Sequence, residues 1–537
     1  MILQDFRRLF ANSRRMVKSP ETPRDWATQV ARLEQQVLAL TARVEWYEAH
    51  FRLQAHRQFG SAHEGSDALQ LQLFNEAEAT APSPLAPATE TIVYERRKKT
   101  KGQREADLAH LPLERIEYTL PADEQVCEVC QGPLHTMSTE IRRELAVIPA
   151  QVKVIEHVQH VYSCRTCERG ALTTPIRTAP MPRSVYPGSL ASASLLAETL
   201  HQKFTTGLPL YRQEQEWQRL GVPLSRQTLA NWVLYAAHEW LNPLYVQLQV
   251  ALRLRDILHA DETTLQVLHE EGRRAEQQSY MWLYRTGRDT PAIVLYEYRP
   301  TRGGEHPKSF LRGFQGYLHV DGYSGYHDLE HVTLVGCWAH ARRKYMDALK
   351  SLPAAQRDGP SLVREGLEFC NRLYAIERDL THATPEERLR ARRARSRPVL
   401  AQFLRWLRAQ RRIVLPKSAL GQAVIYCLNQ WTPLTRFLCD GRLEIDNNRA
   451  ERSIKPFVIG RKNFLFANTP RGAQASAIVY SIVETAKENG LNPRAYLQYL
   501  FERLPNRDLA DPTIWQDLLP WSPALPAELK TPIRHQV

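Results

Sequence analysis

Apolar residues near the N-terminus repeat with a helical spacing. Over residues 30–51 they recur at alternating steps of three and four, which is typical of a coiled-coil seam. The members of this seam are Val30, Leu33, Val37, Leu40, Val44, Tyr47 and Phe51. An amphipathic helix packed on its own protein would give a related pattern. The polar positions between the apolar ones favour self-association, so we expect a homodimer or higher oligomer.

Residues 189–240 have the residue pattern of a helix-turn-helix. Helical apolar patterns lie on both sides of Gly221, and Ser225 stands where a helix N-cap is expected. A second helix of this kind lies in the DNA major groove and contacts base edges. The residues that we expect to face bases are Arg226, Gln227 and Asn231. A helical hairpin without a ligand would show the same pattern.

The middle of the chain alternates apolar and polar residues with the period of β-strands. This pattern predicts strands at 257–268, 280–284, 292–298, 317–320 and 332–335, and a helix at 307–314. Three strands with hairpin-like breaks, a helix and further strands follow one another in the order of a ribonuclease H-like fold. A helical block then extends to about residue 440. We therefore expect an α+β core followed by a helical block.

Two apolar runs within the predicted strands lead into an aspartate. The run 257–260 leads into Asp261, and the run 317–320 leads into Asp321, which Gly322 follows. Open α/β sheets keep their ligands at the carboxyl ends of strands, so the two carboxylates are expected to share a site. The alternative is that each is an ordinary turn residue at a strand end.

A third acid is expected from a late helix in the sequence EIDNNRAER, residues 444–452. Asp446 is the predicted helix cap, and Glu451 would lie just over one turn inside, facing the sheet. Three carboxylates suit two Mg²⁺ or Mn²⁺ ions, which activate an attacking hydroxyl and stabilise a leaving oxygen. A salt-bridged surface helix would have the same spacing. Residues placed downstream to hold a DNA backbone are Lys455, Arg461 and Lys462.

The segment CWAHARR opens a helix after the fifth predicted strand. Cys337 and His340 could ligate a metal, although no second ligand pair is visible. His340 or Arg342 could instead stabilise charge at a scissile phosphate. Further along, an arginine run is either a phosphate-contact face or a solvated surface, and it comprises Arg388, Arg390, Arg392, Arg393, Arg395 and Arg397.

Composition narrows the choice of partner. The 537 residues, 43% hydrophobic and 24% charged, are enough for three or more folded units. The chain has 71 Lys and Arg residues and 58 Asp and Glu residues, which gives a net charge of +13. This charge favours a polyanionic partner, and nucleic acid is the first candidate. No apolar stretch approaches the ~20 residues of a membrane span, and the arginine-containing N-terminus lacks a signal-peptide core. We expect a cytoplasmic, nucleoid-associated protein without a membrane partner.

A proline-rich stretch at 79–90 precedes a basic run. This run is either a flexible DNA-binding arm or a solvated charge cluster, and its leading members are Arg96, Arg97, Lys98 and Lys99.

Two CxxC pairs, each followed by a glycine, supply the ligands of a closed tetrahedral zinc site. They are Cys127, Cys130, Cys164 and Cys167. Such a site has no open position, so the zinc is expected to be structural. A redox dithiol needs only one pair, which makes that alternative weak. Alternation over 152–161 predicts a hairpin between the two pairs.

Several motifs together resemble the transposases of the IS-sixty-six family of bacterial insertion sequences, and the likeness covers nearly the whole chain. They are Asp-Glu-Thr at Asp261, Asp-Gly-Tyr at Asp321, CWAHARR at Cys337 and DNNRAERSIKP at Asp446. The resemblance implies an acidic triad at Asp261, Asp321 and Glu451, zinc at the four cysteines, a DNA-reading helix over 225–233, and accessory proteins of the same element. One departure is Ser61-Ala62-His63-Glu64, where the family has a Ser-Glu pair.

The expected architecture is a multidomain α+β chain. It has an N-terminal helical, zipper-like region (1–78), a linker (79–110), a zinc-ribbon-like module (111–180) and a helix-turn-helix region (181–250). A ribonuclease H-like core (251–350 and 441–500) follows, interrupted by a helical insertion (351–440) and followed by a tail (501–537). The predicted function is that of a DNA transposase that binds terminal inverted repeats and target DNA, cleaves and transfers strands with metal ions. A non-catalytic DNA-binding regulator and a ribonuclease H-like nuclease are the alternatives.

Overall fold

The computed structural model of the protein describes residues 152–163, 176–288 and 291–531, together with the single positions 33, 37 and 44. The chain divides into two compact units, one formed by residues 1–84 with 180–537 and the other by residues 85–179. The basic run at 96–99 and the four predicted zinc ligands lie outside the described residues. So does most of the predicted coiled-coil seam, of which Leu33, Val37 and Val44 are helical and exposed.

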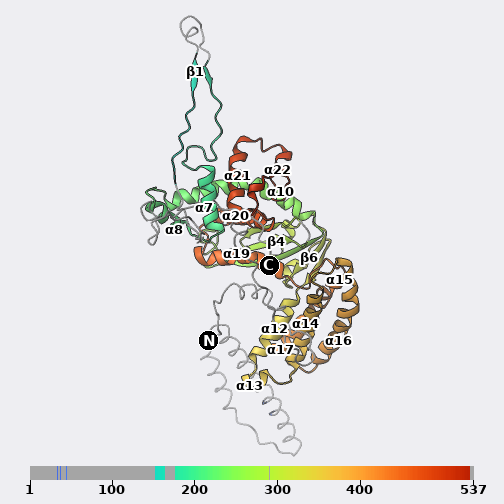
Figure 1. The fold of residues 1–537 in the computed structure, drawn as a ribbon. Coiled ribbons are helices and arrows are strands. Elements are labelled where there is room, and N and C mark those ends of the chain that lie inside the picture. Colours follow the sequence, from blue (N-terminus) through green and yellow to red (C-terminus); the bar gives the residue numbers. More distant parts are fainter. Residues whose placement is uncertain are drawn as a thin grey trace, which may run out of the picture. The chain divides into compact units, whose positions relative to one another are not determined.

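In the unit 85–179, strand β1 (Val161–Ser163) pairs antiparallel with β2 (Ile176–Thr178) (Figure 1). The pairing continues beyond the strands, where Ala179 N donates to His160 O at 3.0 Å. The partner strand therefore follows the second CxxC pair. The hairpin predicted at 152–161 between the two pairs is wrong in this respect, because residues 152–160 form no strand and β1 pairs with β2, which follows the second pair in the sequence.

A five-stranded mixed sheet lies at the centre of the larger unit (Figure 1). Its strands are β3 (Ile257–Gln266), β4 (Gln278–Thr286), β5 (Val294–Arg299), β6 (Gly316–Val320) and β7 (Val332–Gly336). Their spatial order is β5-β4-β3-β6-β7, antiparallel between β5, β4 and β3 and parallel between β3, β6 and β7. The five strands predicted from the sequence are all present, with small shifts at their ends. The predicted helix at 307–314 is α11 (Glu305–Phe310).

Two late helices return to this sheet. Helix α19 (Asn448–Phe464) packs on β3 and β4, and α20 (Pro470–Glu488) packs along β5. The backbone of β5 is satisfied by hydroxyls of α20: Tyr296 N donates to Ser481 Oγ at 2.8 Å, and Val294 N donates to Thr485 Oγ1 at 3.0 Å. Since an open strand edge invites pairing with other chains, α20 both fills the core and covers this edge.

The helix-turn-helix segment packs into the same hydrophobic core. Helix α7 (Ala193–Phe204) precedes α8 (Leu210–Arg219) and α9 (Arg226–Tyr235), and Gly221 adopts a φ of +77° in the turn between the last two. Ser225 accepts a hydrogen bond from Thr228 N at 3.1 Å, which confirms the predicted cap. A π-helical turn, η2 (Ala236–Leu241), leads into α10 (Asn242–Arg253).

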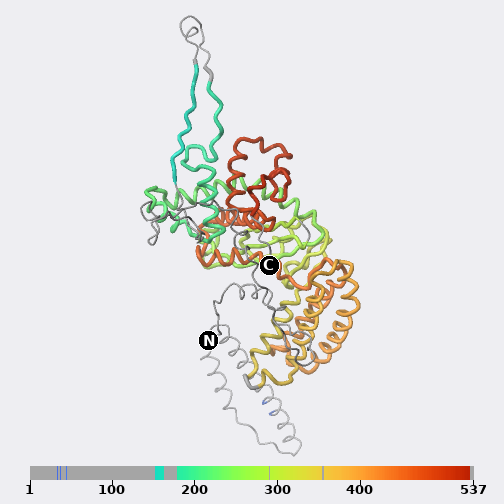
Figure 2. The backbone as a smooth tube through the Cα atoms, in the orientation of Figure 1, coloured from blue at the N-terminus to red at the C-terminus, as the bar shows by residue number. Residues whose placement is uncertain are grey.

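The insertion forms a helical layer with its own hydrophobic cluster. Helix α12 (Trp338–Ser351) packs on α14 (Leu362–Asp379) and α17 (Ala419–Asn429), and α16 (Arg397–Gln410) closes the group. The shorter elements are α13 (Ala354–Arg357), α15 (Pro385–Ala391), η4 (Arg392–Ser396), α18 (Trp431–Thr435) and η5 (Arg436–Leu438). In Figure 2 this segment is the yellow-to-orange stretch, gathered beside the sheet.

The arginine run of the insertion does not form one surface. Arg388 is buried and donates to the backbone oxygens of Gly441 and Ala383. Arg392 is buried as well, where it pairs with Glu377 at 2.6 Å. The prediction of a common phosphate-contact face is therefore wrong for these two, because helical spacing turns every fourth side chain inward. The arginines that remain exposed are Arg390, Arg393, Arg395 and Arg397.

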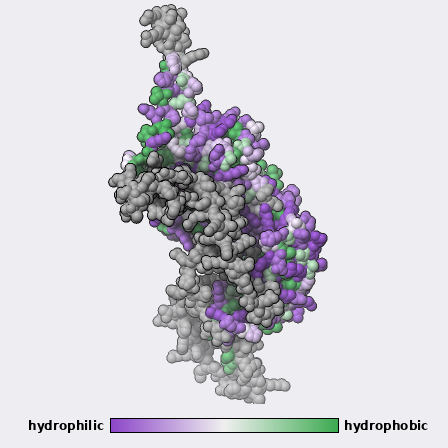
Figure 3. All heavy atoms as spheres, in the orientation of Figure 1, coloured by the Kyte–Doolittle hydropathy of each residue, from purple (hydrophilic) through white to green (hydrophobic). Residues whose placement is uncertain are grey.

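The C-terminal part adds α21 (Pro493–Arg503), η6 (Leu504–Asn506), α22 (Pro512–Leu518) and η7 (Ala527–Leu529). Helix α21 packs against α7, so the end of the chain supports the helix-turn-helix segment. Hydrophilic residues predominate on the coloured part of the face shown in Figure 3. Among the described residues, every helix falls short of the length and apolar character that spanning a bilayer requires.

Candidate active site with three carboxylates

The parallel pairing of β3 with β6 sets two aspartates at the same level. Ile257 is opposite Tyr317 and His259 is opposite His319 in this register. Continued by two residues, the same register puts Asp261 opposite Asp321. Because side chains alternate across a sheet, both aspartates lie on the face that carries the two histidines. The histidine rings stack with their centroids 4.2 Å apart, so the strands are closely aligned up to the acids.

Helix α19 supplies the third acid, and Asn447 fixes where this helix begins. The side-chain Nδ2 of Asn447 donates to Ala260 O at 2.8 Å, and its Oδ1 lies 2.9 Å from His259 Nδ1. Its backbone N donates to Cys337 Sγ at 3.2 Å. One asparagine therefore ties the helix start to β3 and to the end of β7. Glu451 follows in the first turn.

The predicted cap residue of α19 is shifted by one position. The N-cap is Asn447, and Asp446 is buried, where it accepts hydrogen bonds from Tyr374 Oη at 2.9 Å and from Asn448 N at 3.1 Å. The sequence favours an aspartate as a cap, whereas here Tyr374 of the insertion helix α14 and the backbone amide of Asn448 donate to its carboxylate. Glu451 remains in the first turn in either case.

The three acids interact electrostatically. Burial and the neighbouring carboxylates of Glu262, Glu451 and Asp321 raise the pKa of Asp261 well above its usual range. Burial is the largest cause of this shift, and the three neighbouring carboxylates add a repulsion that protonation relieves. A divalent cation would relieve it equally, so the donor set fits Mg²⁺ or Mn²⁺, which prefer carboxylate oxygens.

The backbone around Asp321 is held by the insertion. Tyr426 of α17 donates to Asp321 O at 2.8 Å, and Tyr323 N donates to the Asp321 carboxylate at 2.9 Å. Gly322 has a φ of +98°, and a Cβ there would lie 3.0 Å from the Gln430 side chain. A larger residue at 322 would be strained and crowded, so the end of β6 has a fixed direction.

Glu451 faces α12 as well as the sheet. Its Oε1 is 3.6 Å from His340 Nδ1, and its Oε2 is 3.3 Å from a guanidinium nitrogen of Arg343. His340 therefore lies beside Glu451, and its predicted role at a scissile phosphate stays a prediction. Arg343 lies beside Glu451 too, although sequence reasoning did not single it out.

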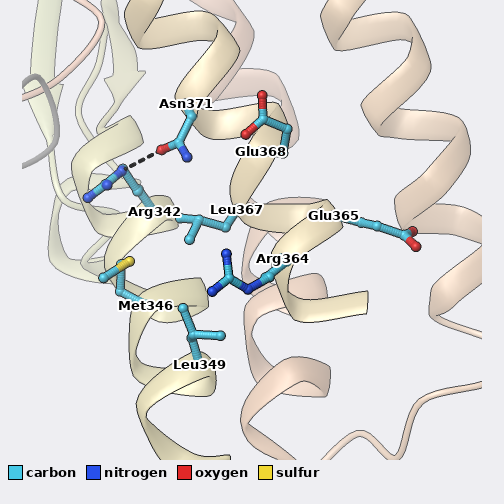
Figure 4. A pocket seen from close by; sticks show the side chains of 8 residues that line it. All are labelled: Arg342, Met346, Leu349, Arg364, Glu365, Leu367, Glu368 and Asn371. Carbon is cyan, nitrogen blue, oxygen red and sulfur yellow. Dashed lines mark hydrogen bonds between the residues drawn. The ribbon is translucent and has the colours of Figure 1, made fainter. Parts of the chain in front are cut away.

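Arg342 lies elsewhere. Its side chain is buried and its Nε donates to Asn371 Oδ1 at 3.0 Å, the contact drawn in Figure 4. It lines a pocket of about 610 Å³ between α12 and α14 that contains none of the three acids. We assign Arg342 to the packing of the insertion, in place of the phosphate contact that the sequence predicted, because the helix turns this side chain away from Glu451.

The base-reading side chains predicted on α9 lie on its solvent face. Arg226, Gln227 and Asn231 are all exposed, and Gln227 Nε2 donates to Asn231 Oδ1 at 3.2 Å. The opposite face, with Leu229 and Trp232, is buried in the core. The three polar side chains therefore share one solvent-exposed face of α9.

The predicted backbone-binding residues on α19 divide into different environments. Lys462 is exposed, while Lys455 is half-buried. Arg461 donates to Thr264 Oγ1 at 3.1 Å and to Thr263 Oγ1 at 3.3 Å, which fastens α19 to β3 beyond Asp261. Part of the role predicted for Arg461 is thus structural.

Several residues of the site were missed from the sequence. Glu262 is held by Tyr326 Oη at 2.6 Å and by Arg302, beside Asp261. The buried His259 and His319 lie under the acids, and burial lowers the pKa of His319 to about 4. A signal for this pair was available, because each aspartate is preceded by a histidine two residues earlier, in His259-Ala-Asp and His319-Val-Asp.

Comparison with known families decides the relationship. The family model described as "Transposase IS66 family" matches residues 188–475, which is more than half of the chain and includes all three acids. The chain belongs to the IS66 transposase family. The IS-sixty-six resemblance of the motifs is confirmed. Three further matches are the "zinc-finger binding domain of transposase IS66" at 124–168, the "IS66 C-terminal element" at 481–521 and "Transposase C of IS166 homeodomain" at 46–116.

Curated relatives share most of the length of this IS66 transposase family member. The uncharacterized protein y4jD of Sinorhizobium fredii is 32% identical over 444 residues, covering 79% of this chain and 84% of the relative. The uncharacterized protein y4qI of the same organism is 31% identical over 468 residues, covering 84% and 82%. The IS66 zinc-finger match contains Cys127, Cys130, Cys164 and Cys167, which supports a structural zinc.

Proposed function

We propose that this protein is a DNA transposase that binds the terminal inverted repeats of an insertion sequence, cleaves at their ends and joins the freed 3′ hydroxyls to target DNA. The observation that carries the proposal is the convergence on Asp261: the parallel register brings Asp321 beside it, and α19 adds the charge of Glu451. The strand order β5-β4-β3-β6-β7 supports a ribonuclease H-like core, with acids on its first and fourth strands in chain order.

Asp261, Asp321 and Glu451 would hold the catalytic cations. Two Mg²⁺ or Mn²⁺ ions, when bound, supply activation of the attacking oxygen and stabilisation of the leaving oxygen. The protein contributes the placement of the acids. Because burial and the neighbouring carboxylates raise the pKa of Asp261, cation binding at this site should weaken as the pH falls. Arg343, next to Glu451, would add positive charge where negative charge develops on the transferred phosphate. Burial lowers the pKa of His340, so its ring would offer a hydrogen bond there in place of a charge.

DNA recognition would belong to other elements. The exposed Arg226, Gln227 and Asn231 of α9 are proposed to read bases of the inverted repeat, because these side chains pair with guanine and adenine edges. Lys462 and the basic run 96–99 are proposed to contact phosphates. The four cysteines of the zinc-finger match are proposed to hold a structural zinc. The apolar seam from Val30 to Phe51 is proposed to join copies of the chain, and accessory proteins of the element are further proposed partners.

The test is an assay with labelled repeat-end DNA, supercoiled plasmid and Mg²⁺. A transposase yields plasmid with the labelled end covalently joined. A nuclease of the same fold would give cut ends without joined product, and a DNA-binding regulator would give a gel shift without either. Asp321→Asn should abolish cutting and joining by at least about 10³-fold while the shift of end DNA persists. Joining that survives in Asp321→Asn would refute the proposal.

A further inference from the structure

Three metal-ligating side chains of different chemistry meet beside the proposed catalytic acids. Cys337 is the N-cap of α12, His340 lies in the first turn of the same helix, and Glu451 lies in the first turn of α19. The sulfur, one ring nitrogen and one carboxylate oxygen all lie within 4.8 Å of one another. We call these three residues the Cys-His-Glu cluster. It is brought together by two helix starts, which place their first turns side by side.

Two atoms of the cluster lack hydrogen-bond partners. His340 Nδ1 and Glu451 Oε1 are shielded from solvent, and within 152–163, 176–288 and 291–531 neither has a hydrogen-bond partner. They face each other at 3.6 Å, which is too long for a hydrogen bond. Buried polar atoms are nearly always satisfied, so such a pair indicates a ligand between them. The other oxygen of Glu451 is engaged by Arg343 at 3.3 Å.

The sulfur of Cys337 is held in place by backbone hydrogen bonds. It is fully buried and receives hydrogen bonds from the backbone amides of Asn447, at 3.2 Å, and His340. Burial and the carboxylates of Asp446 and Glu451 raise the pKa of this thiol, while the two amide donors lower it, so zinc binding would displace the thiol proton. The cluster thus offers one soft sulfur, one imidazole and one carboxylate, a donor set that suits zinc and not magnesium.

We propose that Cys337, His340 and Glu451 form a Zn²⁺ site that competes with the proposed Mg²⁺ site for Glu451. Zinc bonds of about 2.0 to 2.3 Å place tetrahedral ligands roughly 3.3 to 3.8 Å apart, a spacing that the His340–Glu451 separation already meets. With Oε1 bound to zinc and Oε2 paired with Arg343, neither oxygen of Glu451 is available to bind a Mg²⁺ ion held by Asp261 and Asp321. Zinc at this site therefore inhibits strand transfer. The inhibition rests on the proposed function, while the binding of zinc does not.

Zinc content of the full-length chain tests the site without any DNA chemistry. Wild type, Cys337→Ser, His340→Ala and Cys439→Ser are each equilibrated with a small excess of Zn²⁺, desalted and analysed for zinc per chain. Cys439 is an exposed free thiol and serves as the matched control. Any zinc bound by Cys127, Cys130, Cys164 and Cys167 contributes equally to all four proteins. Wild type and Cys439→Ser should hold one zinc more than the two cluster variants. Equal zinc in all four proteins would overturn the proposal, and His340→Ala decides it should Cys337→Ser not fold.

A second measurement tests the inhibition. Strand transfer at fixed Mg²⁺ is compared with and without micromolar Zn²⁺, each variant being normalised to its own zinc-free rate. Wild type and Cys439→Ser should slow at least tenfold, and His340→Ala less than twofold. Equal inhibition of all three proteins would contradict the proposal that zinc competes with Mg²⁺ for Glu451. If no protein transfers strands but the zinc difference is present, the zinc site stands and the proposed function fails.

Discussion

Asp261 is expected to lower the stability of the folded protein when its carboxylate is ionised. It lies within β3, directly after the buried residues 257–260, and the charges of three other carboxyl groups act on it. Its raised pKa means that the ionised form destabilises the folded protein. This cost is absent below the usual aspartate pKa, where the folded and unfolded chains are both protonated, and it grows as pH rises towards and through the folded value.

Asp261→Asn removes this cost, because the amide mimics the protonated carboxyl. At pH 7 to 8 the free energy of unfolding should rise by about 0.5 to 2 kcal/mol, and the gain should shrink towards zero as pH falls to the ordinary aspartate pKa. Urea unfolding of the metal-free protein across this pH range measures it. Asp508→Asn, at an exposed acid, should show no such pH-dependent gain. A loss of stability at pH 8 in Asp261→Asn would contradict the proposed clustering of charge.

At the scale of elements, the site depends on where α19 begins. The strands and the two aspartates could be predicted from the sequence, because a buried strand ending in Asp-Gly has a strong local pattern. The start of α19 could not, since Asp446 and Asn447 are both good caps and only the tertiary contacts of Asn447 with β3 and Cys337 decide between them. The inward turn of Arg388 and Arg392 likewise depends on the carbonyls that the folded insertion offers.

Asn447→Ala tests whether this junction positions Glu451. Asn371→Ala is the matched control, because it also removes a buried asparagine that bonds across elements. Both should lose about 1 to 3 kcal/mol of stability. Asn447→Ala alone should raise the Mg²⁺ concentration for half-maximal cleavage and lower kcat at least about tenfold, with end binding retained. If both variants leave the Mg²⁺ dependence unchanged, Asn447 is structural only.

At the scale of the whole molecule, the proposal separates DNA reading from chemistry. The polar face of α9 and the proposed catalytic acids belong to different elements of one hydrophobic core. Helix α21 packs on α7 and on α20, and α20 packs on β5, which connects the two parts. The helix-turn-helix was predictable because Gly221 and the Ser225 cap are local signals. The pairing of β1 with β2 was not, since a three-residue strand has too little pattern to reveal its partner.

Arg226→Ala and Asn231→Ala should therefore weaken binding to the inverted repeat by about 1 to 3 kcal/mol each, or roughly 5- to 150-fold, while non-specific binding changes little. Fluorescence anisotropy with repeat and scrambled duplexes, at one salt concentration, measures both. Arg412→Ala, an exposed arginine of the insertion, is the control and should leave specificity intact. Equal losses on both duplexes would assign α9 to phosphate contacts only.

The most direct test of the central claim is Mn²⁺ binding, followed by electron paramagnetic resonance, in wild type, Asp261→Asn, Asp321→Asn and Glu451→Gln. Glu502→Gln, at an exposed acid of α21, is the control. If the three acids share one site, each of the three variants should bind Mn²⁺ at least about tenfold more weakly than wild type, and the control should match wild type. Undiminished Mn²⁺ affinity in Glu451→Gln would show that the helix does not complete the site formed by the two strands.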